Sequence, residues 1–420
     1  KTMKIFIVLF LLLFGVIFLQ FDDAPNNEVT SYVSLIENRM EIESEAYLYL
    51  NGIAVSEGQD VISEGVRLLA EYKSPPLVLA LFDGGNPTKE NRASDLAPGR
   101  DSFFNCKFLD EACFSAIAAN SESWGHEVGH WSEYLKRYEK FISYSEFITM
   151  TRPSVKEKIQ DYTYLVFGNR LKMLSILSLV RLELHQEAFD KLTEDNARLR
   201  KHVELADNLI HKMVFVSLLA NNLDLLIYLN SIKAIYDFQE IPLLSLSEIN
   251  MTLPLVREFV MGHDALLELD GSPEIFEIGG NMPYWLVKAI FKPYMTMNDS
   301  VNDYSESIRL STLPSKEFAS AIEVIEINEG RGRSFRNYIG SVLNEVSMPS
   351  YYKYTARIHD LNCKITLVNK VLGEKGGGLD NPYGTIYGQN KEKGNLICLG
   401  GPLEDVSNFR CVRKYKSPIT

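Results

Sequence analysis

The chain has 420 residues, of which 46% are hydrophobic and 23% charged, and this balance excludes a disordered or low-complexity protein. The formal net charge of −12 is spread along the sequence without a basic stripe, which argues against nucleic acid or an anionic membrane surface as a partner. The length suffices for one large domain or two ordinary domains.

Residues 5–21 form an uncharged apolar run in which Gln20 is the one clearly polar residue. A helix rises about 1.5 Å per residue, so this run would span roughly 25 Å, close to the ~30 Å hydrocarbon core of a bilayer. Slight thinning of the bilayer makes up the difference. We therefore predict a membrane anchor over residues 1–24, with the membrane bound through residues 5–21.

The flanks of the run predict that the anchor is retained and how it is oriented. A signal-peptide cut before Pro25 would place Asp22 at the −3 position, where a small residue is needed. Lys1 and Lys4 precede the run and Asp23 follows it, so the positive-inside rule places the N-terminus in the cytoplasm. The bulk of the chain is then exported.

Between residues 28 and 235 the sequence has helical periodicity and few breakers outside a Pro- and Gly-rich stretch at 74–102. We expect further helices over residues 158–185 and 187–230. The clearest apolar stripe predicts one helix after Cys113, through Phe114, Ile117, Trp124, Val128, Trp131, Leu135, Tyr138 and Ile142. Antiparallel packing of such helices predicts a helical-bundle domain over 28–235.

The sequence pattern changes in residues 240–420 and predicts a second region of mixed secondary structure. Short helical and loop signals extend to Pro349, and β-favouring runs follow at 356–368, 384–388, 395–400 and 409–415, separated by glycine-rich turns. We expect short C-terminal β-hairpins there. The predicted fold class is therefore mainly α: an N-terminal transmembrane helix, a helical-bundle ectodomain and a small α+β C-terminal region.

The cysteines form two pairs that are close in sequence, Cys106 with Cys113 and Cys398 with Cys411. An oxidising compartment favours bridging them, and their spacings do not match the paired C-x-x-C motifs of zinc sites. Cys363 is left over, and we expect it to be a buried free thiol.

One motif suggests chemistry: residues 126–130 read H-E-x-x-H. On a helix His126 and His130 project to the same side and can hold Zn²⁺, while Glu127 can act as general base on a metal-bound water. These five residues resemble the motif of the zincin metallopeptidases. The resemblance implies a zinc peptidase with His126 and His130 as metal ligands and Glu127 as the catalytic base.

Other features favour a simpler interpretation of this motif. His126 and His130 fall on the polar side of the helix, opposite the apolar stripe. Glu133 and Lys136 stand where the extended metzincin pattern requires glycine and histidine. Candidates for a third ligand lie on a later helix without a recognisable signature, at Glu183, His185 and Glu187. Two surface histidines on an amphipathic helix would account for the motif.

Five segments resemble a group of proteobacterial single-pass inner-membrane proteins with a helical periplasmic domain and no assigned activity. They are residues 45–52, 106–113, 135–138, 188–195 and 206–213. The likeness extends over about 45–229 and also includes the N-terminal anchor. The resemblance implies a single-pass protein of the bacterial inner membrane, with a cytoplasmic N-terminus and a periplasmic body. An H-E-x-x-H motif is not a required feature of that group.

The function expected from these observations is that of a non-enzymatic, membrane-anchored periplasmic interaction or scaffold protein. Its partner would be a protein that docks on the helical bundle, and no cofactor is expected. The alternative is a membrane-tethered zinc metallopeptidase that uses His126, Glu127 and His130, and zinc is expected only in that case.

Overall fold

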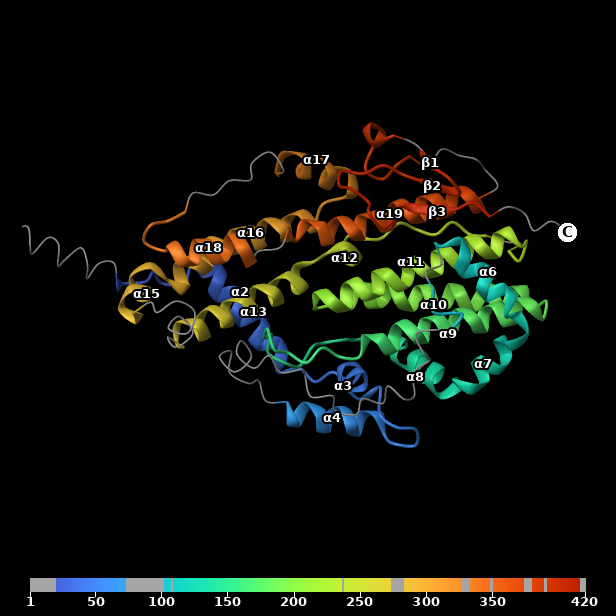
Figure 1. Cartoon of the computed structure of the whole chain (residues 1–420), viewed down its shortest axis with the longest axis horizontal. Coiled ribbons are helices and arrows are strands. Elements are labelled where there is room, and N and C mark those ends of the chain that lie inside the picture. Colours follow the sequence, from blue (N-terminus) through green and yellow to red (C-terminus); the bar gives the residue numbers. More distant parts are fainter. Residues whose placement is uncertain are drawn as a thin grey trace, which may run out of the picture.

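The computed structural model describes residues 20–72, 102–106, 109–235, 238–272, 283–325, 333–347, 350–373, 380–388 and 391–415. In these ranges the chain is mainly helical, with a small sheet near the C-terminus, as the sequence predicts. Residues 1–19 of the predicted anchor lie outside these ranges. The body is elongated, with α15 at one end and α6 and α7 at the other (Figure 1).

Three short helices open the described chain, and each begins after a side chain that accepts a hydrogen bond from a backbone N–H of the first turn. The helices are α2 (Asn27–Met40), α3 (Glu45–Gly52) and α4 (Val61–Glu71), capped by Asn26, Ser44 and Asp60. Helices α3 and α4 pack closely at Gly65, where a Cβ atom would lie 1.9 Å from the carbonyl oxygen of Leu48. Glycine is therefore required at that crossing.

The single helix predicted after Cys113 is wrong, because the structure divides it into three. The three helices are α6 (Glu111–Ala119), α7 (Trp124–His130) and α8 (Ser132–Ile142), and a short 3₁₀ turn η2 (Ser121–Ser123) precedes α7. Asn120 and Trp131, at the two breaks, have non-helical ψ values of 21° and 23°. The breaks change the direction of the chain, so that α7 and α8 can each pack against α9.

Three longer helices form the centre of the bundle: α9 (Tyr162–Arg181), α10 (His185–Leu205) and α11 (Leu209–Ser231). The predicted helix over 187–230 is thus divided at 206–208, where Asn208 accepts a hydrogen bond from the N–H of His211 at 2.8 Å and starts α11. Among the described residues, α11 is the one helix long and apolar enough to cross a membrane. Two-thirds of its most apolar window is buried within the protein, as in the core helix of a globular bundle.

The second region is also largely helical. Its helices are α12 (Leu246–Ile249), α13 (Thr252–Asp270), α15 (Tyr284–Ile290), α16 (Pro293–Ser311), α17 (Ser315–Ile325), α18 (Tyr338–Ser347) and α19 (Tyr352–Leu372). The β prediction for 356–368 is wrong, since these residues lie within α19. Packing overrides the β propensity there: α19 is buried on almost all sides, and its polar side chains bond to other elements.

The predicted C-terminal hairpins are confirmed as an antiparallel sheet in the order β1 (Lys391–Lys393), β2 (Leu396–Cys398) and β3 (Cys411–Arg413). Residues 384–388, also predicted as β, instead contain the 3₁₀ turn η3 (Thr385–Tyr387).

The two predicted regions share one core. Helix α2 from the first region packs against α13 and α16 of the second, with the rings of Tyr32 and Phe259 5.5 Å apart. Helix α11 packs against α19 in the same way (Figure 1). The apolar residues buried by these contacts belong to a single cluster that extends from Val29 to Val412.

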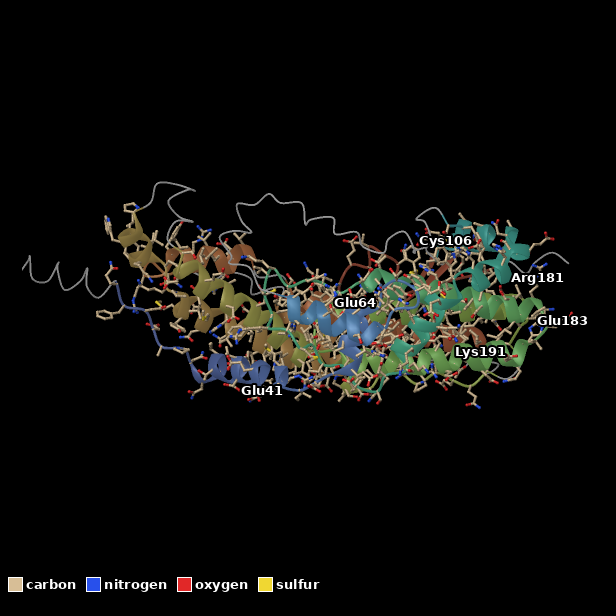
Figure 2. All side chains as sticks on the ribbon, turned by 90° about the horizontal axis from the view of Figure 1, so that it is seen from below. Glu41, Glu64, Cys106, Arg181, Glu183 and Lys191 are labelled. Carbon is tan, nitrogen blue, oxygen red and sulfur yellow. A yellow bond between two sulfur atoms is a disulfide. The ribbon has the colours of Figure 1, made fainter. Side chains whose placement is uncertain are left out.

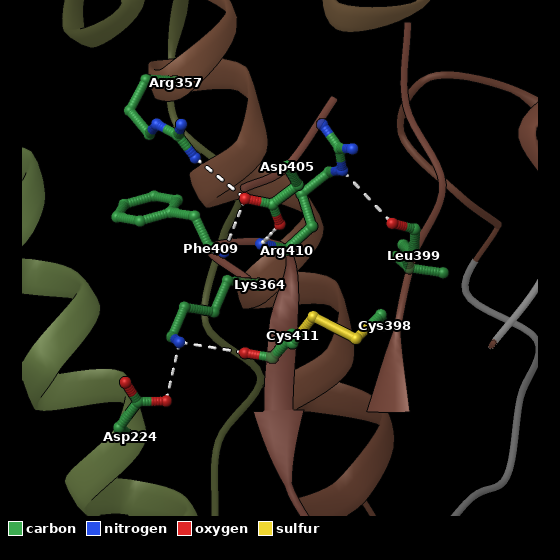
Figure 3. Close-up of a disulfide and its surroundings, with 9 residues drawn as sticks. All are labelled: Asp224, Arg357, Lys364, Cys398, Leu399, Asp405, Phe409, Arg410 and Cys411. Carbon is green, nitrogen blue, oxygen red and sulfur yellow. Dashed lines mark hydrogen bonds and ion pairs between the residues drawn. A yellow bond between two sulfur atoms is a disulfide. The ribbon is translucent and has the colours of Figure 1, made fainter. Parts of the chain in front are cut away.

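Both predicted disulfides are present, and Cys363 is a buried free thiol. Cys398 and Cys411 are paired across β2 and β3, and Figure 3 shows the polar contacts around this bridge. Lys364 of α19 lies beside it and donates a hydrogen bond to the carbonyl oxygen of Cys411 at 3.0 Å. The sheet is thereby tied to the helical core.

Candidate functional site

The H-E-x-x-H residues lie on α7, at the outer surface of the molecule. The His126 side chain is 80% exposed, whereas Trp124 on the opposite side of the same helix is buried. The rings of His126 and His130 are parallel, with centroids 6.2 Å apart, and Glu127 is 28% exposed. The prediction that the two histidines occupy the polar side of the helix is confirmed.

A zinc hydrolase site needs a third protein ligand beside the two histidines. The described residues contain no group of three or more His, Cys, Asp or Glu side chains that could hold a metal ion. The later-helix candidates Glu183, His185 and Glu187 are therefore not brought together with His126 and His130. Figure 2 shows Glu183 projecting from the end of the molecule.

A second pair of histidines, His202 and His211, is completely buried in an aromatic cluster. The His202 ring stacks on Phe215 with centroids 4.6 Å apart, and the His211 ring stacks on Phe147 at 4.0 Å. Burial lowers the pKa of His202 to about 4 and the pKa of His211 further below its ordinary value. Both rings are neutral near pH 7 and act as core aromatics.

A buried carboxylate, Asp195, lies at the centre of a polar network between α8, α9, α10 and α11. It accepts hydrogen bonds from Asn222 at 2.8 Å and from Tyr138 at 3.4 Å, and Asn169 donates to Asn222 at 3.0 Å. Burial raises the pKa of Asp195 to about 6. The side chains of all four residues are buried in the bundle, so this network joins helices and gives a substrate no access.

Ser315 and His359 form a pair that resembles part of a hydrolase dyad, with the Ser315 Oγ and His359 Nδ1 atoms 2.9 Å apart. The neighbouring Asp360 does not complete a triad. Its carboxylate instead accepts hydrogen bonds from Arg410 at 2.8 Å and from Tyr383 at 2.9 Å. His359 is fully buried and stacks on Phe318. Since a nucleophile must be reachable by substrate, this pair is structural.

An open site lies further along α19, near its C-terminal end. A hollow of about 370 Å³ is lined by the segment before α12, the C-terminal half of α19 and the chain at residues 380–382. Ile241, Pro242, Leu243 and Pro382 supply apolar walls. We call this space the α19 hollow.

The segment that forms one wall of the α19 hollow is held by side chains along its backbone. Asn369 donates to the carbonyl oxygen of Ile241 at 2.8 Å and accepts from its N–H at 2.9 Å. Arg200 donates to the carbonyl oxygens of Pro242 at 2.6 Å and Leu243 at 3.0 Å. An extended segment fixed in this manner forms a preorganised binding surface.

Two carboxylates, Glu240 and Asp380, lie at the α19 hollow, and both residues are exposed. Within the described part of the chain, neither of them forms an ion pair. Apolar walls together with free carboxylates suit a ligand side chain with an apolar stem and a cationic head, such as lysine or arginine. No sequence pattern indicates this site, because its two acids are separated by 140 residues and the wall residue Asn369 lies just beyond a run predicted to be β.

Comparison with protein-family models, curated proteins and solved structures finds no match to this chain. A function for this chain is therefore inferred from the geometry of its own sites.

Proposed function

We propose that this chain is a membrane-anchored, non-enzymatic interaction protein that binds a basic segment of a partner protein in the α19 hollow. One observation carries the proposal. The hollow combines apolar walls with the carboxylates of Glu240 and Asp380, and the backbone of one wall is held by Asn369 and Arg200. Such a site is suited to recognition, and the hydroxyl of Thr366 in its lining donates to the carbonyl oxygen of Asn362 at 2.9 Å.

We further propose that residues 5–21 anchor the chain in the bacterial inner membrane, with the body in the periplasm. The apolar length and flanking charges of that run support this placement. The two disulfides support an oxidising compartment, because such bonds persist outside the cytoplasm.

Peptide binding by the full chain in detergent tests the α19 hollow. Fluorescence anisotropy would compare a labelled peptide in which one lysine is flanked by leucines with the same peptide carrying glutamate instead. We expect the lysine peptide to bind and the glutamate peptide to fail, because the carboxylates at the hollow repel a negative charge. The double variant Glu240→Lys/Asp380→Lys should weaken binding of the lysine peptide at least about tenfold, or about 1.4 kcal/mol.

A matched control is Glu41→Lys/Glu122→Lys, which changes the net charge equally at two exposed positions, one directly after α2 and one in η2. This control should leave binding unchanged. Equal binding of the two peptides would show that the charge of the peptide side chain is not recognised. Equal loss in both double variants would show that general electrostatic attraction and not the hollow is responsible, and either result would contradict the proposal.

A photo-reactive residue at position 243 tests the same site in membranes. Leu243 is 47% exposed at the α19 hollow, and Leu182, which is 68% exposed on the turn between α9 and α10, is the control position. We expect a discrete adduct from position 243 that disappears in the Glu240→Lys/Asp380→Lys background. Adducts of equal yield at both positions would contradict the proposal.

We do not propose the zinc peptidase alternative. His126 and His130 are exposed on α7, and the described residues bring no third ligand to them.

A further inference from the structure

The segment that follows the apolar run is fixed to one end of the body. Asp22 accepts hydrogen bonds from backbone N–H groups in the first turn of α16, including that of Tyr294 at 2.8 Å. Arg336 donates to the carbonyl oxygen of Phe21 at 2.9 Å and lies 3.1 Å from the carboxylate of Asp23. The C-terminal end of the run is therefore held where α15, α16 and α18 meet.

Four aromatic side chains are exposed at this end. Phe335 is 80% exposed, Trp285 64%, Phe21 63% and Tyr338 46%. Phe335 and Tyr338 flank the Arg336 that holds Phe21, and Trp285 lies on α15, which packs against α18. Among the side chains that the structure describes, Tyr354 is the one other exposed aromatic, at 36%. Exposed aromatic residues are thus concentrated beside the apolar run.

We propose that Phe21, Trp285, Phe335 and Tyr338, here called the aromatic end, insert into the interfacial layer of the bilayer that residues 5–21 cross. This inference rests on the proposed anchor. Tryptophan and tyrosine favour the membrane interface, because their rings are apolar and carry a polar group that remains hydrated. A run of roughly 25 Å would place its last residue, Phe21, at the edge of the hydrocarbon core.

The geometry of the body agrees with this placement. Helix α15 and the first residues before α2 lie at the same end of the long axis, and α6 and α7 lie at the other (Figure 1). If the aromatic end contacts the bilayer, α7 points away from it. A rigid connection through Asp22 and Arg336 then sets the orientation of the whole body on the membrane.

Fluorescence of Trp285 in vesicles tests the inference. The full chain would be reconstituted into phosphatidylcholine vesicles with or without brominated acyl chains, which quench tryptophan in the bilayer. We expect quenching in the native chain and loss of the quenched component in Trp285→Phe, because Trp124 and Trp131 lie on or beside α7 at the far end. The control is Leu182→Trp in the Trp285→Phe background, an exposed position near that far end, which should remain unquenched.

Two results would overturn the inference in different ways. If the chain stays with the vesicles after a carbonate wash but Trp285 is quenched no more than the Leu182→Trp control, the aromatic end does not contact lipid and the anchor stands. If the chain is washed off, the anchor and this inference both fail. If the aromatic end instead binds a protein partner, Trp285 stays exposed to water in these vesicles. Aqueous acrylamide would then quench Trp285, and this result would also overturn the inference.

Discussion

Lys364 and Asp224 form a buried ion pair between α19 and α11, with the ammonium nitrogen 2.7 Å from a carboxylate oxygen. The same ammonium group donates to the carbonyl oxygen of Cys411 in β3 (Figure 3). One side chain therefore connects two central helices and the sheet.

Replacing Lys364 with methionine leaves the carboxylate of Asp224 buried without its partner. We expect the free energy of unfolding to fall by about 3–5 kcal/mol, as measured by chemical denaturation. The double variant Lys364→Met/Asp224→Leu removes both charges and should recover much of the loss. Equal destabilisation by the single and double variants would mean that the pair contributes through packing alone.

Stability should decrease on acidification through the buried histidines. The pKa of His202 is about 4 in the folded protein, below its ordinary value of 6.5. Between these values the unfolded chain binds more protons, so the free energy of unfolding falls as the pH is lowered from 6.5 to 4. The contribution of His202 is about 3 kcal/mol over this range. His211 acts in the same direction, whereas Asp195, with a raised pKa, acts in the opposite one.

The variant His202→Phe separates these contributions, because phenylalanine keeps an aromatic ring in the cluster but cannot take up a proton. Urea unfolding at several pH values should show a flatter slope between pH 4 and 6.5 than in the native chain, the range set by the pKa values of His202. The exposed His126→Ala serves as control and should leave the slope unchanged.

The bridge between β2 and β3 should be the more important of the two disulfides for stability. It joins residues 13 apart, compared with 7 for Cys106–Cys113, and a longer closed loop restricts the unfolded chain more. Cys398→Ser/Cys411→Ser should lower the free energy of unfolding by about 3 kcal/mol. Thermal unfolding of this variant and of Cys106→Ser/Cys113→Ser shows which of the two disulfides contributes more to stability. A larger loss in Cys106→Ser/Cys113→Ser would show that local contacts outweigh loop entropy.

The H-E-x-x-H motif yields a prediction about metal content. We expect the purified full chain to retain less than one zinc per chain by mass spectrometry, and His130→Ala to leave that content unchanged, because the described residues provide no third ligand. One zinc per chain that is lost in His130→Ala would revive the peptidase alternative.

Local patterns predicted many of the elements but not their ends. The apolar stripe between Phe114 and Ile142 continues across the breaks at Asn120 and Trp131, since α6, α7 and α8 all turn an apolar side to the core. Residues 356–368 have β-branched residues typical of strands, yet α19 is a helix because its surroundings bury it on almost all sides. A hydrophobic periodicity predicts which residues are buried, but it does not predict the shape of the surface against which they pack.

Local sequence patterns were enough to predict the largely helical character, the two short-range disulfides and the outward placement of His126 and His130 on their helix. Each of these depends on residues that are close together in the chain. Which distant segments meet became visible only in the folded chain. Glu240 and Asp380 come together at the α19 hollow, and Phe21 is held by Arg336 beside Phe335. Such contacts depend on how the whole core packs, and the spacing of residues along the chain does not predict that packing.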